Sequence, residues 1–303
     1  MKKFELPIVF CSDSNFTEHV AVTILSIVKS NPEFSFDFHL ISSESNLAKL
    51  SKLERLSEDY NSTFQSHHPD FSVFDAFPKV HHLNLACYYR LLAPKLIHEK
   101  NYLYLDTDII VSGDLSVFLA YLHSKFVLAA AADPVYRWED DLGMSPGSLY
   151  FNSGVMLVNR EKWNTEKITE RVMEYIASHP SAIRFGDQCA LNAILDGKFE
   201  ELPPSLNQQA IIFRDDIPKM EKIWTPEEID EAINNPVVIH FTGPSKPWQY
   251  QCSHPEKKRY WDFQKWSPFK RNFPEGMKKL DYLKILIPNS FKKKVKEIFN
   301  RNK

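Results

Sequence analysis

Residues 101–113 read NYLYLDTDIIVSG and contain the most informative pattern in the chain. The apolar run 102–105, followed at once by polar residues, predicts a buried strand. Asp106 and Asp108 come directly after it, and side chains at positions i and i+2 of an extended chain point to the same side. Two carboxylates so close repel each other unless a cation or a proton lies between them. Because open α/β sheets bind ligands at the carboxyl ends of their strands, we expect a hard divalent cation that holds a phosphorylated substrate here.

The residues before this stretch predict strands and helices in alternation. Apolar runs at 6–11 and 36–41 and a short run at 63–65 predict strands. Between them, 19–29 and 45–60 place apolar residues at helical spacing. This β-α-β-α-β order is typical of a parallel sheet with covering helices, so we predict the α/β class.

The later part of the chain predicts further elements of both kinds. We expect helices at 86–96, 160–179 and 226–235, a shorter helix that begins near Asp187, and strands at 127–133, 149–159 and 237–241. One of these strands ends in Asp133, and the last carries His240 near its end. A second strand that ends in an acidic residue strengthens the prediction of a cation site. After His240, Gly243 and two prolines indicate a rigid loop at 242–248.

The composition is that of an ordinary globular protein, and its 303 residues are enough to bury a substantial core. A formal net charge of −2 argues against a nucleic-acid partner. The four cysteines, at 11, 87, 189 and 252, lack the spacing of a zinc motif and suggest no disulfide framework. This cysteine pattern favours a reducing compartment.

The C-terminal segment 268–303 differs from the rest of the chain, because it has eleven Lys and Arg against three Asp and Glu. Its Leu, Ile, Val and Phe residues recur near helical spacing among the lysines. A basic amphipathic helix with this pattern can bind an anionic membrane surface. The alternative is a C-terminal helix that packs on the body with its basic face in solvent. We therefore divide the chain into a domain at 1–267 and a membrane-associating tail at 268–303.

A set of short motifs, taken in order, resembles glycosyltransferase family 8, and most closely its bacterial lipopolysaccharide galactosyl- and glucosyltransferases. The motifs lie within about residues 5–252 and are Asp13-x-Asn15, Tyr88-x-Arg90-Leu91, YLDTD, the strand ending in Asp133, Phe151-Asn152-Ser153-Gly154-Val155, Asp187-Gln188 and HFTGPSKPW from His240. The resemblance implies a Rossmann-like, nucleotide-sugar-binding mixed sheet of the GT-A type, flanked by helices. It also implies that a hexose is transferred with retention of configuration.

By this resemblance, Asp106, Asp108 and His240 are the protein ligands of Mn²⁺, with Mg²⁺ as the alternative, and the metal holds the diphosphate of UDP. Two carboxylates and an imidazole are suitable ligands for such a cation. The other residues expected to bind the UDP-sugar are Asp13 and Asn15 for uracil and ribose, Thr107 within the Asp-x-Asp motif, Gly243 and Lys246 for the diphosphate, and Arg90 and Asn152 for the sugar.

The resemblance also implies that Gln188, Asp187 and Asp133 are the catalytic residues. Alone, Asp187 could equally cap the helix that follows it. Retention at carbon 1 normally indicates a nucleophilic carboxylate. The resemblance instead puts the amide of Gln188 beneath the anomeric carbon, and an amide is a poor nucleophile. We therefore favour attack from the front face, with a covalent route through Asp187 as the alternative.

Together these residues predict an enzyme that moves glucose or galactose from a UDP-sugar, in α linkage, to a lipopolysaccharide or other glycolipid saccharide. Its expected location is cytoplasmic, as a peripheral protein on the inner face of the plasma membrane. Loop 134–148 is expected to shape the acceptor pocket, and residues 203–223 are expected to pack over the site.

Two alternative functions remain open at this point. A haloacid-dehalogenase-like, Mg²⁺-dependent phosphatase also has Asp-x-Asp after a strand, and would use Asp106 as nucleophile and Asp140-Asp141 as a second acidic pair. It leaves Asp13-x-Asn15 and the loop after His240 unexplained. A catalytically silent UDP-sugar or glycan-binding module would bind the donor without turnover.

Overall fold

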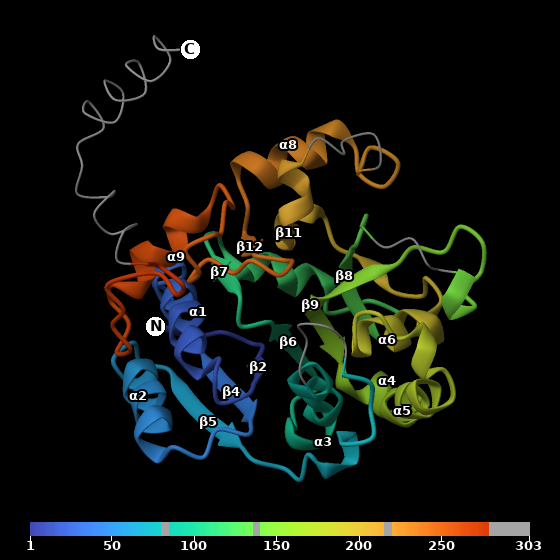
Figure 1. Ribbon diagram of the computed structural model, residues 1–303, viewed down its shortest axis with the longest axis horizontal. Coiled ribbons are helices and arrows are strands. Elements are labelled where there is room, and N and C mark those ends of the chain that lie inside the picture. Colours follow the sequence, from blue (N-terminus) through green and yellow to red (C-terminus); the bar gives the residue numbers. More distant parts are fainter. Residues whose placement is uncertain (80–84, 136–139, 215–219, 279–303) are drawn as a thin grey trace.

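The computed structural model describes residues 1–79, 85–135, 140–214 and 220–278 (Figure 1). Most of the predicted amphipathic tail, and residues Tyr136 and Trp138 of loop 134–148, lie outside these ranges. In the part of the chain that is described, a central sheet is covered by helices on both faces (Figure 1). No helix there is both long enough and apolar enough to cross a lipid bilayer.

The central sheet has seven strands in the order β10-β8-β9-β6-β2-β4-β5. Their bounds are β2 (Ile8–Ser12), β4 (Asp37–Ser42), β5 (Thr63–His67), β6 (Asn101–Leu105), β8 (Leu128–Ala132), β9 (Phe151–Asn159) and β10 (Glu200–Glu201). Strands β6, β2, β4 and β5 are parallel, whereas β9 runs antiparallel between β6 and β8. The predicted α/β class is confirmed, and β6 lies in the middle of the sheet.

Helices cover the two apolar faces of this sheet, apart from α8 (Pro226–Asn234) and α9 (Lys257–Gln264), which pack in two smaller apolar clusters. The helices that cover the faces are α1 (Thr17–Ser30), α2 (Leu47–Glu58), α3 (Ala93–Leu96), α4 (Arg160–Thr165), α5 (Ile168–Ser178) and α6 (Asp187–Leu195). Along β6, Leu103 and Leu105 pack with α1 and α2, whereas Tyr102 and Tyr104 pack with α4, α5 and α6. This alternation buries both faces of β6, as the apolar run predicts.

Three predicted elements differ in detail from the structure. The helix expected at 160–179 is broken into α4 and α5 at Lys167, whose backbone is left-handed with φ of 52°. The helix expected at 86–96 is a 3-10 helix over Leu85–Leu92 that continues into α3. The strand expected at 149–159 begins two residues later, as β9 over Phe151–Asn159.

A small second sheet was not predicted, and it completes the region of the Asp-x-Asp motif. It contains β11 (Gln208–Gln209), β12 (Val238–His240) and β7 (Ile109–Val111), with β12 between the other two. The chain bends at 106–108 to pass from β6 in the large sheet to β7 in the small one. Because β12 pairs antiparallel with β7, His240 lies opposite Ile109 and beside the motif. A further pair, β1 (Lys2–Lys3) with β3 (Phe34–Ser35), lies apart from both sheets.

Candidate functional site

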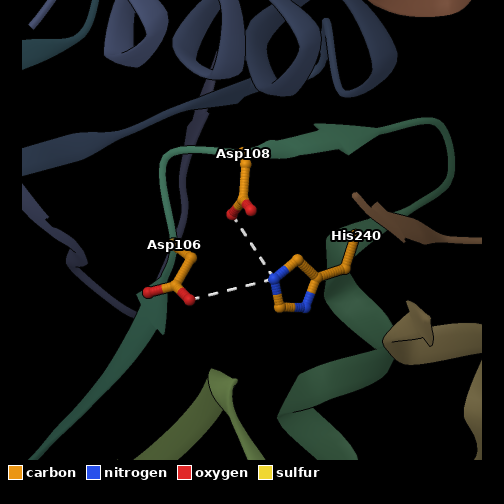
Figure 2. A group of neighbouring side chains, drawn as sticks. All are labelled: Asp106, Asp108 and His240. Atoms are coloured by element: carbon orange, nitrogen blue, oxygen red, sulfur yellow. Dashed lines mark ion pairs between the residues drawn. The ribbon is translucent and has the colours of Figure 1, made fainter. Parts of the chain in front are cut away.

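Asp106, Asp108 and His240 converge on one point at the edge of the two sheets (Figure 2). Nε2 of His240 lies 3.8 Å from Oδ2 of Asp106 and 3.4 Å from Oδ1 of Asp108. One ligand atom from each residue lies within 4.8 Å of the others, which is the spacing a shared metal ion needs. Among the described residues, this is the one cluster of three or more His, Cys, Asp or Glu side chains with that geometry. The donor set of two carboxylates and an imidazole fits Mn²⁺ or Mg²⁺.

Gly154 gives these three side chains the space to meet. A Cβ atom at this position would lie 2.2 Å from Cε1 of His240 and 2.8 Å from Oδ2 of Asp106. Both distances are far inside van der Waals contact, so no other residue fits without moving His240 or Asp106. The carbonyl of Gly154 also accepts the backbone N–H of Asp106 at 2.8 Å. Strand β9 therefore sets the position of the first aspartate.

Arg90 is a buried cation that holds two carboxylates at once. Its Nη2 lies 3.0 Å from Oδ1 of Asp106, and its Nε lies 3.1 Å from Oδ2 of Asp187. The guanidinium stacks over the ring of Tyr104, and the Tyr104 hydroxyl donates to the same Oδ1 of Asp106 at 2.7 Å. These donors occupy Oδ1 of Asp106 and leave Oδ2 facing His240. Arg90 therefore orients Asp106, a candidate metal ligand.

Lys246 lies on the other side of the cluster and forms an ion pair with Oδ2 of Asp108. Its ammonium also donates to the carbonyl of Phe241 at 3.0 Å. Burial works against a charge on Asp108, but Lys246 and His240 outweigh it and hold the pKa of Asp108 below its usual range. The carboxylate is thus kept ionised, which is the form that binds a metal.

An aromatic stack supports the loop that carries Lys246. The ring of Trp248 stacks on His19 with 3.6 Å between ring centroids and an interplanar angle of 12°. Burial lowers the pKa of His19 to about 3, so the ring is neutral, and its Nδ1 lies 2.8 Å from the hydroxyl of Tyr260. Gly243, with φ of +94°, supplies the left-handed turn at the start of this loop. Trp248 is buried and contributes to packing.

A cavity of about 350 Å³ opens on one side of the cluster. Its lining includes Asp106, Asp108, Asp133, Asn152, Asp187, Gln188, His240, Gly243 and Lys246. Gln188 accepts the backbone N–H of Ser153 on Oε1 at 3.0 Å, and its Nε2 donates to Oδ2 of Asp133 at 3.2 Å. The side-chain oxygen of Gln188 is therefore bonded to the backbone of Ser153, and its side-chain nitrogen is bonded to the carboxyl group of Asp133. We call this cavity of about 350 Å³ the larger cavity.

The two acids in the larger cavity have raised pKa values. Burial raises the pKa of Asp187 to about 7, although Arg90 opposes the shift. The backbone N–H groups of Asp187 and Gln188, at the start of α6, also favour the charged form of Asp187. The carboxyl thus contacts both a helix start and Arg90. Burial likewise raises the pKa of Asp133.

A second space of about 130 Å³, the smaller cavity, adjoins the first. Its lining includes Cys11, Ser12, Asp13, Phe16, Ala86, Tyr104 and Thr107, and it shares Cys87, Arg90, Asp106, Asp108 and Lys246 with the larger cavity. The cluster of Asp106, Asp108 and His240 therefore lies where the two cavities meet. Asn15 is exposed, and both its backbone N–H and its side-chain amide donate to Asp13, at 2.8 and 3.3 Å.

The sequence motifs contain most residues of these cavities, and one further segment lies outside the motifs. Gln209, Ala210, Ile211 and Arg214 also line the larger cavity, within the stretch 203–223 that was expected to cover the site. Asn207, fully buried nearby, contacts His240 and was not predicted. No motif marks Asn207, and only its place one residue before strand β11 brings it to the site.

This fold and this site define a glycosyltransferase of the GT-A type. The sequence profile of Glycosyl transferase family 8 matches residues 7–252, and the chain belongs to that family. The resemblance found in the motifs is thereby confirmed.

Similar proteins agree with this assignment. General stress protein A of Bacillus subtilis is 28% identical over 87% of this chain and 94% of its own length. The lipopolysaccharide 1,2-glucosyltransferase of Escherichia coli K12 is 28% identical over 91% of this chain and 82% of its own length. The crystal structure of the galactosyltransferase LgtC with donor and acceptor sugar analogs matches with a TM-score of 0.78 at 22% identity, over 88% of this chain and 98% of that one. At that identity the structural match supports the fold alone.

Proposed function

We propose that this protein transfers glucose or galactose from a UDP-sugar, with retention of configuration, to a lipopolysaccharide or other glycolipid saccharide. The observation that carries the proposal is the position of the Asp106, Asp108 and His240 cluster at the junction of the two cavities. A nucleoside in the smaller cavity and a hexose in the larger one would bring the linking diphosphate to this cluster. The glucosyl- and galactosyltransferase relatives support the same choice of sugar.

The three ligands fit Mn²⁺, or Mg²⁺ as the alternative. Such a metal, when bound, supplies a Lewis acid to the departing diphosphate. Lys246, already at the cluster, adds a positive charge for a phosphate oxygen. Arg90 and Tyr104 keep Asp106 turned toward the junction, so the site needs little rearrangement to receive the anion.

Gln188 supports the front-face route. Its oxygen accepts the backbone N–H of Ser153, and its nitrogen donates to Asp133, so the amide is engaged at both ends. An amide held in this way can orient sugar hydroxyls but is a poor nucleophile. Asp187 is buried and paired with Arg90, which weakens its nucleophilicity. The covalent route through Asp187 remains the alternative, and a glycosyl adduct on this residue would establish it.

The phosphatase alternative loses its second acidic pair in the structure. Asp141 pairs with Arg184 on the surface at 2.7 Å, and Asp140 is also exposed. Neither lines the cavities that contain Asp106. Together with the family membership, this removes the phosphatase from consideration. The silent binding module differs from the enzyme only in turnover, so an assay of UDP release separates those two.

The first experiment is calorimetric binding of UDP, UDP-glucose and UDP-galactose, with Mn²⁺ or with a chelator. We expect tight binding of UDP that requires Mn²⁺, and its loss in Asp108→Asn, because one metal ligand and the partner of Lys246 are removed together. Asp141→Asn is the matched control and should bind as the wild type does. UDP binding that is equally tight in the presence of chelator would refute the metal site. If UDP does not bind under any condition, the proposal that the donor is a UDP-sugar is refuted.

We also propose that the enzyme acts at the cytoplasmic face of the plasma membrane, held there by the tail at 268–303. Residues 268–278 contact the body, since Phe269 is buried and Arg271 pairs with Glu18 at 3.0 Å. Nearby, Trp266 and Phe273 are 62% and 49% exposed, as expected for side chains at a membrane surface. Deletion of 279–303 alone avoids disturbing these contacts. It should release the protein from anionic vesicles while hydrolysis of a soluble donor survives, and unchanged vesicle binding would refute an anchor within residues 279–303.

A further inference from the structure

The imidazole of His240 is engaged on the side away from the cluster. Its Nδ1 lies 2.9 Å from Oδ1 of Asn207, which is fully buried. An amide oxygen can only accept a hydrogen bond. Nδ1 therefore carries a proton, and in the neutral ring it is Nε2, facing Asp106 and Asp108, that carries the lone pair. That lone pair is the electron pair with which a histidine binds a metal.

The orientation of the Asn207 amide follows from a backbone group. The N–H of Gly154 donates to Oδ1 of Asn152 at 3.0 Å, and a backbone N–H can only donate. Oδ1 of Asn152 is thus an acceptor, and Nδ2 of Asn207 donates to the same oxygen at 3.1 Å. A flipped Asn207 would set its amide oxygen against Oδ1 of Asn152, which is already an acceptor, and would lose this bond. One backbone amide therefore fixes, through two side chains, which nitrogen of His240 is free.

The same network reaches the floor of the larger cavity. Nδ2 of Asn152 donates to Oε1 of Gln188 at 3.4 Å, and the backbone N–H of Ser153 donates to that oxygen at 3.0 Å. Nε2 of Gln188 is consequently turned to Asp133. Each bond has a defined donor, so the direction of every amide from His240 to Asp133 is determined by two backbone N–H groups of β9.

We propose that Asn207 is a positioning residue that holds His240 in its Nδ1–H tautomer and so makes Nε2 available as a metal ligand. The inference rests on the metal site of the proposed function and adds the group that prepares it. Partners of this kind behind a metal-binding histidine change metal affinity by about 10- to 100-fold when they are removed.

Two substitutions of Asn207 distinguish a role in positioning His240 from a role in packing alone. Asn207→Leu has a similar size but offers no acceptor to Nδ1–H. Asn207→Asp keeps an acceptor for Nδ1–H. The matched control is Gln208→Leu, because Gln208 is an equally buried amide on the next residue that donates to the carbonyl of Ala232 rather than to the site. It reports the cost of losing a buried amide in this segment.

The experiment is nitrogen-15 NMR of histidine-labelled, metal-free protein, with the His240 signals identified by their absence in His240→Gln, together with Mn²⁺ titration. We expect the Nδ1–H tautomer in wild type, in Asn207→Asp and in Gln208→Leu, and its loss in Asn207→Leu with about 10- to 100-fold weaker Mn²⁺ binding. Asn207→Asp should bind Mn²⁺ within a few-fold of wild type.

An unchanged tautomer and Mn²⁺ affinity in Asn207→Leu would overturn the proposal, as would an Nε2–H tautomer in the wild type, which needs no variant. If Asn207→Leu does not fold, a neutral Nε2–H tautomer in the folded Asn207→Asp protein would also overturn it, because a carboxylate at this position can only accept from Nδ1–H. A wild type that has the Nδ1–H tautomer but binds no Mn²⁺ would refute the proposed metal site, while the response of the tautomer to Asn207→Leu would still support the positioning role.

Discussion

The two cavities that meet at the Asp-Asp-His cluster are built from the chain in different ways. Apart from Lys246, the smaller cavity is lined by three short segments, at 11–16, 86–90 and 104–108. The larger cavity collects residues from 87 to 246, including the ends of β8 and β12 and the starts of β9 and α6. The smaller one lies at the carboxyl ends of the neighbouring parallel strands β2 and β6, where an α/β sheet ordinarily binds its ligand.

The larger cavity depends on the antiparallel strand β9. Because β9 runs opposite to β6 and β8, its beginning meets their carboxyl ends. The polar residues Asn152, Ser153 and Gly154 therefore arrive beside Asp106 from a strand that starts where the others finish. The difference suggests separate roles for the two cavities, nucleoside on the parallel side and sugar on the antiparallel side. Four substitutions test it, beginning with the largest effect.

Arg90 lines both cavities, and its removal should disturb the molecule most. Arg90→Met leaves the carboxylates of Asp106 and Asp187 without their buried cation. Loss of one partner of a buried pair costs about 3–5 kcal/mol of unfolding free energy, measured by urea denaturation. Arg184→Met, which breaks the surface pair with Asp141, should change it by about 0–1 kcal/mol. Similar losses in the two variants would mean that Arg90 is not the shared support of the cavities.

Gly154→Ala tests the junction itself. The added methyl group would lie 2.2 Å from His240, so the ring or Asp106 must move. A displacement of about 1 Å in such a site can cost roughly 100-fold, and we expect Mn²⁺-dependent UDP affinity to fall by at least about that factor in calorimetry. Gly113→Ala is the matched control, because its backbone also allows alanine and its methyl group would approach Val237 at 3.0 Å, and neither residue lines a cavity. Tight UDP binding by Gly154→Ala would show that the cluster tolerates a rearrangement that the static geometry forbids.

The two cavities also differ in how far the sequence could predict them. Strand β6 and the Asp-x-Asp motif are local, and the apolar run before Asp106 identifies both. Strand β7 was missed because a three-residue apolar run directly after Asp108 has no distinguishing period. Asn207 was missed for a different reason. Its contact with His240 depends on the pairing of β11 with β12, which sets Gln209 opposite His240 and which no local pattern encodes.

The raised pKa of Asp187 gives the larger cavity a pH-dependent effect on stability. The folded protein favours the protonated carboxyl, with a pKa of about 7 against an ordinary value of 3.8. The stabilising contribution is therefore complete below about pH 4 and is lost as the pH rises toward 7. Relative to Asp187→Asn, the unfolding free energy of the wild type should fall across this window with a slope of up to about 1.4 kcal/mol per pH unit. If urea denaturation gives the same difference in unfolding free energy between the two proteins at every pH from 4 to 7, the raised pKa of Asp187 is contradicted.

The smallest effect is expected at the far end of the smaller cavity. Asp13→Ala removes one hydrogen-bonding carboxylate that is partly exposed, so UDP should bind about 3- to 10-fold more weakly. UDP-glucose and UDP-galactose should weaken by the same factor, because the lost contact is to the nucleoside. Asp13→Asn keeps an acceptor and should lose less. Gln188→Ala should behave in the opposite way, with UDP affinity unchanged and UDP-sugar affinity reduced. If Asp13→Ala instead distinguishes UDP from the UDP-sugars, the sugar reaches the parallel side of the site, and the division of roles between the two cavities is wrong.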